Sequence, residues 1–457
     1  MTPSYEKYDA VVCGAGIAGI AGAHALTQIG LKRVLIADPR PPLSLTSDKS
    51  TECYRNWWPG PGDDMVALMN RSIDLMESHA KDSDNVFLLN RRGYLFATAN
   101  PEMADKFALQ ASEAESLGAG PLRHITNDAL YRPASAHGFE NGLDGADLIT
   151  DKDIINAHFP YINPEAVAVL HARRCGSLSA QQMGMYLLER TRENGGELFS
   201  AELIGVETSA GRVTSVVLEA AGDVIEIRTD NIVLSTGPYM KVCAALLGID
   251  LPVAVEKHIK ISLSDPYRAV PREAPLIFWA DPITLSWSNE EKEALSQSDD
   301  TQYLLEEFPA GVHGRPVGAG DQVLMYWPYD CELNKDPIFP LEWDPYLPDI
   351  TLRGMARLVP GLERYFDPMP KPYVDGGYYT KTQENRPLIG PLRVSGAYVC
   401  AAFSGFGIMA SCASGELLAK HITGDLLPHY ANAFNPARYS DPEYCKLLET
   451  WDSSGQL

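Results

Sequence analysis

The chain has 457 residues, enough for a large buried core and roughly two or three domains. It carries 38 lysine and arginine residues against 60 aspartate and glutamate residues, so its formal net charge is −22 at pH 7. That charge repels phosphate backbones and anionic lipid headgroups, which argues against a nucleic-acid partner and against binding to a membrane surface.

The N-terminal segment has the pattern of a strand, a glycine turn, a helix and a second strand. Residues 8–13 are an apolar run that ends in glycines, and residues 20–29 are small or apolar, as in a tightly packed helix. Residues 33–38 form a second apolar run with an acidic residue at its end. The segment therefore predicts one βαβ unit.

The rest of the chain alternates between two kinds of sequence pattern. Helical periodicity and strand-like runs predict helices over 64–79, 180–194 and 410–422 and strands over 94–97, 212–218, 231–235, 322–327 and 397–402. Residues 98–170 are a mixed region of acidic helical pieces and loops, and residues 256–370 are rich in proline and aromatic residues, as in an antiparallel sheet with long loops. His313 to Pro316 is expected to form a loop turn.

These patterns predict an α/β fold with two domains. A Rossmann-like dinucleotide-binding domain is assembled from the separated segments 1–97, 171–255 and 371–457. An α+β substrate domain, built on an antiparallel sheet, is inserted as residues 98–170 and 256–370.

The cysteines and the apolar segments bear on where the protein works. The eight cysteines are scattered and contain no C-x-x-C pair, which is typical of reduced thiols in a cytoplasmic protein. No segment reaches the roughly 18 unbroken apolar residues of a membrane span. We therefore expect a cytoplasmic protein without a membrane span.

The glycine turn has the spacing of a dinucleotide site. Gly14, Gly16 and Gly19 form G-x-G-x-x-G between the strand and the helix, where the chain must turn tightly and let its backbone approach a pyrophosphate. Asp38 follows about 20 residues later, where a carboxylate can accept hydrogen bonds from a ribose. These features predict dinucleotide binding without separating NAD from FAD.

Five motifs, taken in order, resemble the FAD-dependent amine oxidoreductases of the D-amino-acid oxidase superfamily. They are residues 14–19 (GAGIAG), 49–58 (KSTECYRNWW), 235–238 (STGP), 379–391 (YTKTQENRPLIGP) and 403–409 (FSGFGIM). The sequence is most similar to the branch that contains monomeric sarcosine oxidase and dimethylglycine dehydrogenase.

The resemblance implies a cofactor and the residues that bind it. The cofactor would be FAD, with its adenosine and pyrophosphate half near the N-terminal turn and its isoalloxazine wrapped by residues near the C-terminus. The implied binding residues are Gly14, Gly16, Ile17, Ala18, Gly19, Asp38, Ser50, Thr51, Val206, Gly237, Gly405, Gly407 and Ile408.

The chain departs from the family pattern at several positions. Gly377 stands where sarcosine-oxidase-like enzymes attach the flavin through a cysteine, so non-covalent FAD is expected. The oxygen-activating lysine of these enzymes would fall near Met325 or Tyr326, which leaves O2 or another electron acceptor open. A lysine that pairs with the substrate carboxylate is replaced by Met409, and an arginine is replaced by Glu52.

The candidate substrate site has two charged residues. Glu52 could accept the amine proton as a catalytic carboxylate, or it could be solvated or paired with Arg55. Arg55 matches a carboxylate-binding residue of the family, and its alternative role is a structural ion pair with Glu52. Substrate-binding candidates are Arg55, Trp58, Tyr326, Tyr379 and Met409, and the histidines lack metal-ligand spacing, so no metal site is expected.

The resemblance implies an FAD-dependent oxidoreductase that acts on CH-NH or CH-NH2 donors. It would oxidise a C–N bond of a small amine or N-alkyl amino acid to an imine by hydride transfer to the flavin. The alternative is a flavin-bearing assembly or electron-transfer protein without amine oxidase activity, for which the missing lysines are the argument.

Overall fold

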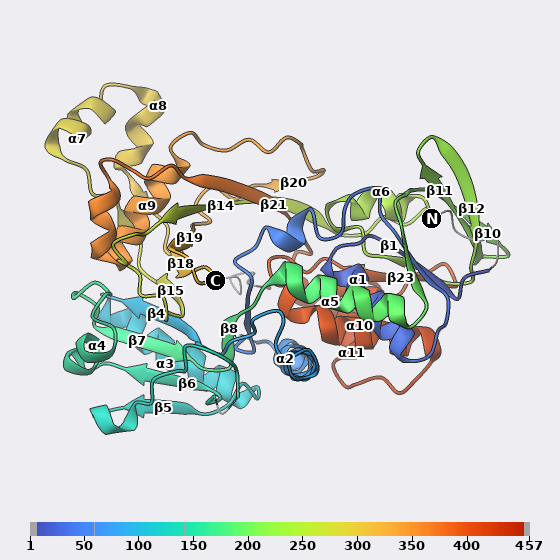
Figure 1. Cartoon of the computed structure of the whole chain (residues 1–457), viewed down its shortest axis with the longest axis horizontal. Helices are drawn as coiled ribbons and strands as arrows, with labels where there is room; N and C mark the ends of the chain where they lie inside the picture. The colour runs from blue at the N-terminus through green and yellow to red at the C-terminus, as the bar shows by residue number, and fades with distance from the viewer. Residues whose placement is uncertain (1–6, 59, 141, 452–457) are drawn as a thin grey trace.

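The computed structural model describes residues 7–58, 60–140 and 142–451 (Figure 1). Its strands form two large sheets at opposite ends of the molecule, as the two ends of Figure 1 show. The α/β fold with a Rossmann-like domain and a second domain on a largely antiparallel sheet is confirmed. In the described ranges, no helix is long and apolar enough to cross a membrane.

The smaller of these sheets is the nucleotide-type sheet. It has six strands in the order β22-β23-β13-β1-β2-β9, and neighbouring strands run parallel except β22 and β23. Its strands are β1 (Ala10–Cys13), β2 (Val34–Ala37), β9 (Gly196–Phe199), β13 (Ile232–Leu234), β22 (Leu388–Pro391) and β23 (Ala397–Ala401). The strands β1 and β2 are buried on both faces, which explains their unbroken apolar runs.

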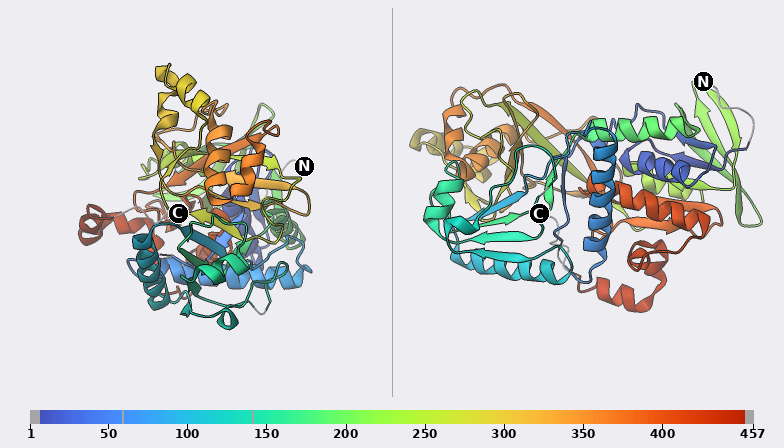
Figure 2. Two further views of the ribbon diagram at one scale, coloured as in Figure 1. Left: turned by 90° about the vertical axis from the view of Figure 1, so that its left-hand side faces the viewer. Right: turned by 60° about the horizontal axis from the view of Figure 1, so that its bottom comes forward.

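The helices of this half pack against one another beside the sheet. The helix α1 (Ile17–Gln28) contacts both α10 (Gly407–Thr423) and α5 (Ala180–Glu193), and α10 contacts α2 (Asp64–Asp82). The α1 helix begins at Ile17, three residues before the expected start, because Gly16 already serves as its N-cap. Figure 2 shows α2 standing between the two halves of the molecule.

A three-stranded antiparallel sheet lies at the end of the molecule nearest the N-terminus (Figure 1). It consists of β10 (Glu202–Ser209), β11 (Arg212–Ala220) and β12 (Asp223–Arg228). Its buried side chains, such as Val216 and Leu218, join the core beneath β1 and β13.

The second large sheet has ten strands in the order β20-β14-β19-β18-β15-β4-β7-β6-β5, with β21 also paired to β14. Its strands are β4 (Tyr94–Thr98), β5 (Leu122–Ile125), β6 (Ala146–Ile149), β7 (Ala168–Ala172), β14 (Ala254–Ser264), β15 (Leu276–Trp279), β18 (His313–Pro316), β19 (Gln322–Tyr326), β20 (Leu333–Asn334) and β21 (Tyr373–Lys381). The remaining helices of the described residues are α3 (Pro101–Ser116), α4 (Lys152–His158), α6 (Met240–Ala245), α7 (Asn289–Leu295), α8 (Asp299–Gln302), α9 (Leu347–Leu358), α11 (Ala431–Phe434) and α12 (Pro442–Leu448).

The strands of this sheet bear on two sequence predictions: the domain boundaries and the structure of residues 313–316. The expected boundaries after residues 97, 170 and 255 fall inside β4, β7 and β14, because those strands continue through them; the outer ends of the expected domains, 1–6 and 452–457, lie outside the described residues. His313 to Pro316 is the buried strand β18, not a loop turn, because it pairs with both β15 and β19.

Candidate functional site

A first cavity lies where the six-stranded sheet meets β21, at the carboxyl ends of β1 and β13. In parallel sheets this edge is where nucleotide ligands bind. The lining residues are Gly16, Ile17, Ala18, Thr46, Ser47, Ser50, Ser235, Gly237, Tyr378, Tyr379, Thr380, Cys400, Ala401, Ala402, Phe403, Ser404, Gly405, Gly407 and Ile408.

Gly14, before α1, and Gly19, in its first turns, are positions where only glycine fits. Gly14 has a φ of +111°, and a Cβ at that position would lie 2.3 Å from the carbonyl oxygen of Ser235. A Cβ at Gly19 would lie 1.9 Å from the carbonyl oxygen of Gly14. The first turn of α1 holds no acidic residue, and Ile17 donates its backbone N–H to Ser47 Oγ at 2.9 Å. The positive end of the helix therefore faces a site suited to phosphate oxygens.

Asp38 is oriented at the end of β2 by backbone N–H groups. Its Oδ2 accepts a hydrogen bond from Ala15 at 2.8 Å, and its Oδ1 accepts one from Arg40 at 2.9 Å. The carboxylate is thus held beside the glycine turn, where a ribose would lie next to a pyrophosphate.

Two cations from the ten-stranded sheet, one half-buried and one buried, hold the end of the short helix at Thr46–Asp48 and the segment that follows it. Lys260 on β14 donates through Nζ to the carbonyl oxygens of Asp48 and Ser50, at 3.3 and 2.8 Å. Arg315 on β18 donates through Nε to the carbonyl oxygen of Thr51 at 2.7 Å. We call Lys260 and Arg315 the cation clamp, and it fixes a segment that lines both cavities of the site.

The C-terminal motif closes the opposite wall. A Cβ at Gly405 would lie 2.6 Å from the ring of Tyr379, so the backbone at Gly405 packs directly on that ring. The first turn of α10 follows at once, and its residues Gly407 and Ile408 line the first cavity. These backbone cradles, together with the uncapped helix starts, fit FAD.

The expected cofactor residues gather around this cavity, with a few exceptions. Those that line it are Gly16, Ile17, Ala18, Ser50, Gly237, Gly405, Gly407 and Ile408. Gly14, Gly19 and Asp38 form and support the turn beside it, and Thr51 lines a second cavity instead. Val206 is a half-buried residue of β10 and lies outside the lining of both cavities. The sequence analysis missed Ser47, whose hydroxyl meets the start of α1.

The second cavity, of about 300 Å³, shares Tyr379 and Gly405 with the first. Its lining residues are Thr51, Arg55, Trp58, Tyr94, Glu256, His258, Leu276, Phe278, His313, Tyr326, Pro328, Cys331, Tyr379, Lys381, Gly405, Phe406 and Met409. All the expected substrate-binding residues are among them. A small molecule in this cavity would therefore lie against the residues expected to hold the flavin.

Arg55 is the buried cation of the second cavity that the sequence indicated. It lies on β3 (Cys53–Arg55), its side chain is 5% exposed, and its guanidinium stacks 4.4 Å from the ring centre of Trp58. Burial lowers the pKa of Arg55, while the nearby Tyr94 and Cys175 raise it. A planar guanidinium held in this way is suited to bidentate binding of a carboxylate.

Glu52 does not line the second cavity. It also does not form the ion pair with Arg55 that was one alternative from the sequence. Its Oε2 lies 3.3 Å from Arg315 Nη2, and its Oε1 accepts a hydrogen bond from the backbone of Ala180 at 3.1 Å. The partner comes from β18 because the cation clamp reaches this segment from the other sheet. The ion pair with Arg55, one of the alternatives that the sequence left open, is not formed, and Glu52 pairs with the distant Arg315.

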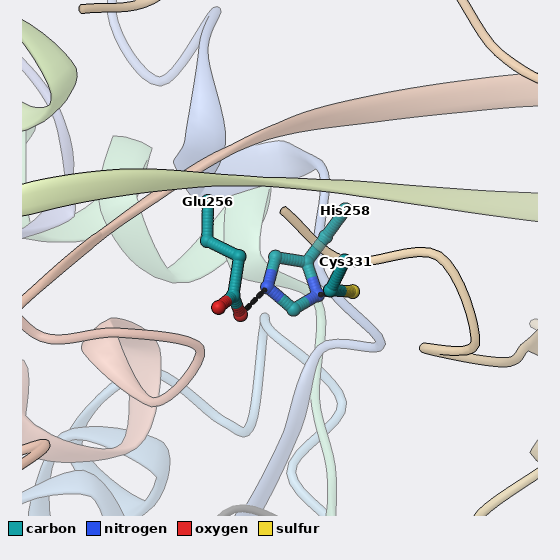
Figure 3. Close-up of side chains that lie close together, drawn as sticks. All are labelled: Glu256, His258 and Cys331. Atoms are coloured by element: carbon teal, nitrogen blue, oxygen red, sulfur yellow. Dashed lines mark hydrogen bonds and ion pairs between the residues drawn. The ribbon is translucent and has the colours of Figure 1, made fainter. Parts of the chain in front are cut away.

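The second cavity also holds a polar cluster that the sequence analysis missed, shown in Figure 3. His258 Nε2 lies 2.7 Å from Glu256 Oε1, and His258 Nδ1 is hydrogen-bonded to the hydroxyl of Tyr326 and lies 3.5 Å from Cys331 Sγ. Lys381 Nζ lies 3.0 Å from both carboxylate oxygens of Glu256. A Glu-x-His pair on a strand was the available signal, since alternate strand residues share one face.

The charges of this cluster depend on one another. Burial would raise the pKa of Glu256, but hydrogen bonds and charges from His258 and Lys381 bring it down to about 2. Burial lowers the pKa of His258 despite the opposing effect of Glu256. Burial, together with the Glu256 charge, raises the pKa of Cys331 to about 12, so its sulfur is a thiol at neutral pH.

The chain thus combines a cavity beside a glycine turn of the dinucleotide-binding type with a second cavity that shares Tyr379 and Gly405 with it. Residues 9–421 match the protein family described as FAD dependent oxidoreductase, and the chain belongs to that family of enzymes. No curated protein sequence matches the chain.

Several solved structures share the fold over nearly the whole chain. L-proline dehydrogenase from P. horikoshii has a TM-score of 0.73 and 19% identity, covering 96% of this chain and 99% of its own. Glycine oxidase from Geobacillus kaustophilus has a TM-score of 0.70 and 16% identity, covering 94% and 98%. L-amino acid deaminase from Proteus vulgaris has a TM-score of 0.69 and 16% identity, covering 96% and 99%.

Proposed function

We propose that this enzyme oxidises the C–N bond of a small amino acid or N-alkyl amino acid to an imine. The observation that carries the proposal is that a chamber with the buried Arg55 shares Tyr379 and Gly405 with the cofactor cavity. FAD, when bound, supplies the acceptor for the hydride that leaves the carbon next to nitrogen. The shared residues support a substrate position beside that acceptor.

The roles of the chain's residues follow from their positions. Arg55 holds the substrate carboxylate through its planar fork, and the rings of Trp58, Tyr326 and Tyr379 with the side chain of Met409 wall the chamber. Positioning of the reacting carbon and exclusion of water supply most of the catalytic power. Glu52 has a structural role in place of proton acceptance, because it is held by Arg315 outside the chamber.

The similar structures support an amino acid as the substrate. Their names describe a proline dehydrogenase, a glycine oxidase and an amino acid deaminase, each acting on an amino acid. Membership of the sarcosine oxidase branch is supported by the sequence motifs alone. The electron acceptor is O2 or another oxidant, and the free thiols of the described cysteines support a cytoplasmic location.

We also propose that FAD is bound without a covalent bond. Gly377 on β21 offers no sulfur, and a Cβ there would already lie 3.3 Å from atoms of Lys49 and Thr46. Acid precipitation of the purified yellow protein should release all the flavin into the supernatant. Yellow colour that stays in the pellet would show an anchor at another residue.

The test of function is anaerobic reduction of the flavin by defined amines. Glycine, sarcosine, L-proline and iminodiacetate, each added without oxygen, should include at least one compound that bleaches the flavin absorbance within seconds to minutes. The decarboxylated partners methylamine, dimethylamine and pyrrolidine serve as controls that lack the carboxylate. If no amine reduces the flavin while dithionite does, the alternative of an electron-transfer or assembly protein is favoured.

A further inference from the structure

We propose that Glu256, His258 and Tyr326 form a proton relay that removes the ammonium proton of the bound substrate. The inference rests on the proposed function and deepens it, since it names the group that prepares the amine for oxidation. An aliphatic amine with a pKa of about 10 is about 99.9% protonated at pH 7, and the protonated form cannot release a hydride from its neighbouring carbon. A group that takes this proton inside the chamber is therefore useful to the reaction.

The relay is built on two paired strands of the ten-stranded sheet. Glu256 and His258 are alternate residues of β14, so both project from the same face of that strand into the chamber. Tyr326 ends the neighbouring strand β19 and brings its hydroxyl to His258 Nδ1. Glu256, His258 and Tyr326 are 8%, 6% and 8% exposed, so the chain of hydrogen bonds is shielded from bulk water.

The direction of the relay follows from the chemistry of its two ends. The Glu256 carboxylate can only accept hydrogen bonds. His258 must therefore carry its hydrogen on Nε2, towards Glu256. The neutral ring then has a lone pair on Nδ1, which accepts from the Tyr326 hydroxyl. Lys381 bridges both oxygens of Glu256 and keeps that group ionised. The ring of Tyr379, stacked 3.9 Å from His258, holds the imidazole plane.

The arrangement argues against reading the same residues as the ligands of one metal ion. Glu256 and Cys331 lie at opposite ring nitrogens of His258, as Figure 3 shows. The ammonium of Lys381 also lies on both oxygens of Glu256, where a cation would have to bind. One potential ligand atom of each residue lies within 4.8 Å of the others, but a single ion can use only one nitrogen of His258, whereas Glu256 and Cys331 approach different ones.

The transfer balances without any further reactant. The N–H bond of the substrate ammonium breaks as a bond forms to Tyr326 Oη, and the original O–H bond of Tyr326 breaks as its proton moves to His258 Nδ1. His258 becomes an imidazolium whose Nε2–H is held by the Glu256 carboxylate. No electrons change hands in this step, and the neutral amine that it leaves is the form that can be oxidised.

The groups around His258 determine the pH range in which its ring is neutral and can accept a proton. Glu256 favours the charged ring, whereas Lys381 on β21 and burial disfavour it. Tyr326 on β19, Tyr379 on β21 and the thiol of Cys331 also face the ring, and the ring of His313 on β18 contacts that of Tyr326 edge to face. His258 is therefore neutral, and able to accept a proton, at pH 7.

The deciding experiment is the pH profile of flavin reduction in the holoenzyme. The probe is whichever of glycine, sarcosine, L-proline and iminodiacetate reduces the wild-type flavin fastest, at saturating concentration under anaerobic conditions. The wild-type rate should be nearly flat between pH 7 and 9 and fall as the solution becomes more acidic than the His258 pKa, which lies below the ordinary value of about 6.5.

The variant Tyr326→Phe removes the proton acceptor and keeps the ring. Its rate at pH 7 should be about 100-fold below that of the wild type and should rise by about tenfold per pH unit towards the pKa of the amine itself. His258→Gln should show the same low rate at pH 7 and the same increase with pH. Tyr303→Phe is the matched control, since its hydroxyl bonds Asp344 outside both cavities, and it should keep the wild-type profile.

Other outcomes separate the relay from its alternatives. A Tyr326→Phe rate that is low at every pH, without recovery in alkaline solution, would return Tyr326 to a packing role and overturn the relay alone. Loss of wild-type reduction on treatment with a chelator, restored by Zn²⁺, would overturn it in favour of a metal centre. A wild-type protein that no amine reduces contradicts the proposed function.

Nuclear magnetic resonance tests the relay without any turnover. In holoenzyme with ¹⁵N-labelled histidine, the resonances lost in His258→Gln should report a neutral ring with its hydrogen on Nε2 at pH 7. A ring with its hydrogen on Nδ1, or an imidazolium at that pH, would overturn the relay whether or not an amine reduces the flavin.

Discussion

The two cavities share a wall and are made in different ways. The first is lined largely by small residues of contiguous motifs, such as Gly16 and Ala18 near the N-terminus and Gly405 and Gly407 near the C-terminus. The second is lined by large and charged side chains from separate strands, among them His258, His313 and Lys381. In the function proposed above, the constant cofactor meets the first kind of lining, and the substrate meets side chains that can be exchanged singly.

The strongest test of the backbone-built cavity is Gly16→Val. Its methyl groups would occupy the space through which a pyrophosphate approaches the backbone, so the variant should purify without flavin. The fold should persist, because a Cβ at this position would meet only Ser47 Oγ, at 3.3 Å. Flavin absorbance per protein and the circular dichroism spectrum measure the two effects. Gly320→Val, where a Cβ would have no atom within 4 Å, is the control and should stay yellow.

A folded Gly16→Val protein with normal flavin content would place the cofactor elsewhere, and the contrast between the cavities would disappear.

The cation clamp joins the two cavities, and Arg315→Met tests that connection. The substitution leaves Glu52, whose side chain is 19% exposed, without its partner and should lower the free energy of unfolding by about 3 kcal/mol. Denaturant unfolding of the holoenzyme measures the loss. The double variant Arg315→Met/Glu52→Gln should recover part of it, because the uncompensated charge is gone.

The matched control is Arg357→Met, which breaks the exposed pair with Glu165 and should cost less than about 1 kcal/mol. Equal losses in the two arginine variants would mean that the clamp adds nothing beyond a surface ion pair.

The smallest expected effect concerns the side-chain-built cavity. Arg55→Met should weaken binding of a carboxylate-bearing amine by about 1.5–3 kcal/mol, or about 10- to 150-fold, because the bidentate charged hydrogen bonds are lost. Binding of the matching amine without the carboxylate should hardly change, and flavin content should stay normal. Concentration dependence of anaerobic flavin reduction gives both affinities. Equal losses for both amines would remove Arg55 from substrate recognition.

The cofactor cavity was largely predictable from the sequence because its parts are local. Gly14, Gly16 and Gly19 lie within one turn, and their steric reasons hold for any chain that bends from a strand into a helix at this point. The start of α1 was placed late because Gly16 itself caps the helix. Ser47 was missed, since a serine in a loop carries no pattern that links it to a helix start 30 residues away.

The second cavity was only partly predictable because strand register decides it. Glu256 and Lys381 meet because β14 and β21 pair in a register that sets Glu256 against Tyr379 and places Lys381 two residues further along. Nothing in the sequence near either residue indicates that register. The sequence analysis left a Glu52–Arg55 pair open, and the observed partner of Glu52 is Arg315, from a strand more than 250 residues later.

The strand β15 gives the second cavity a further use. Leu276 and Phe278 are alternate residues of this strand, and both line the second cavity but not the first. Shortening either side chain would enlarge the chamber while the cofactor motifs stay intact. A small library of variants at these two positions is therefore a direct route to flavoenzymes that accept bulkier amines.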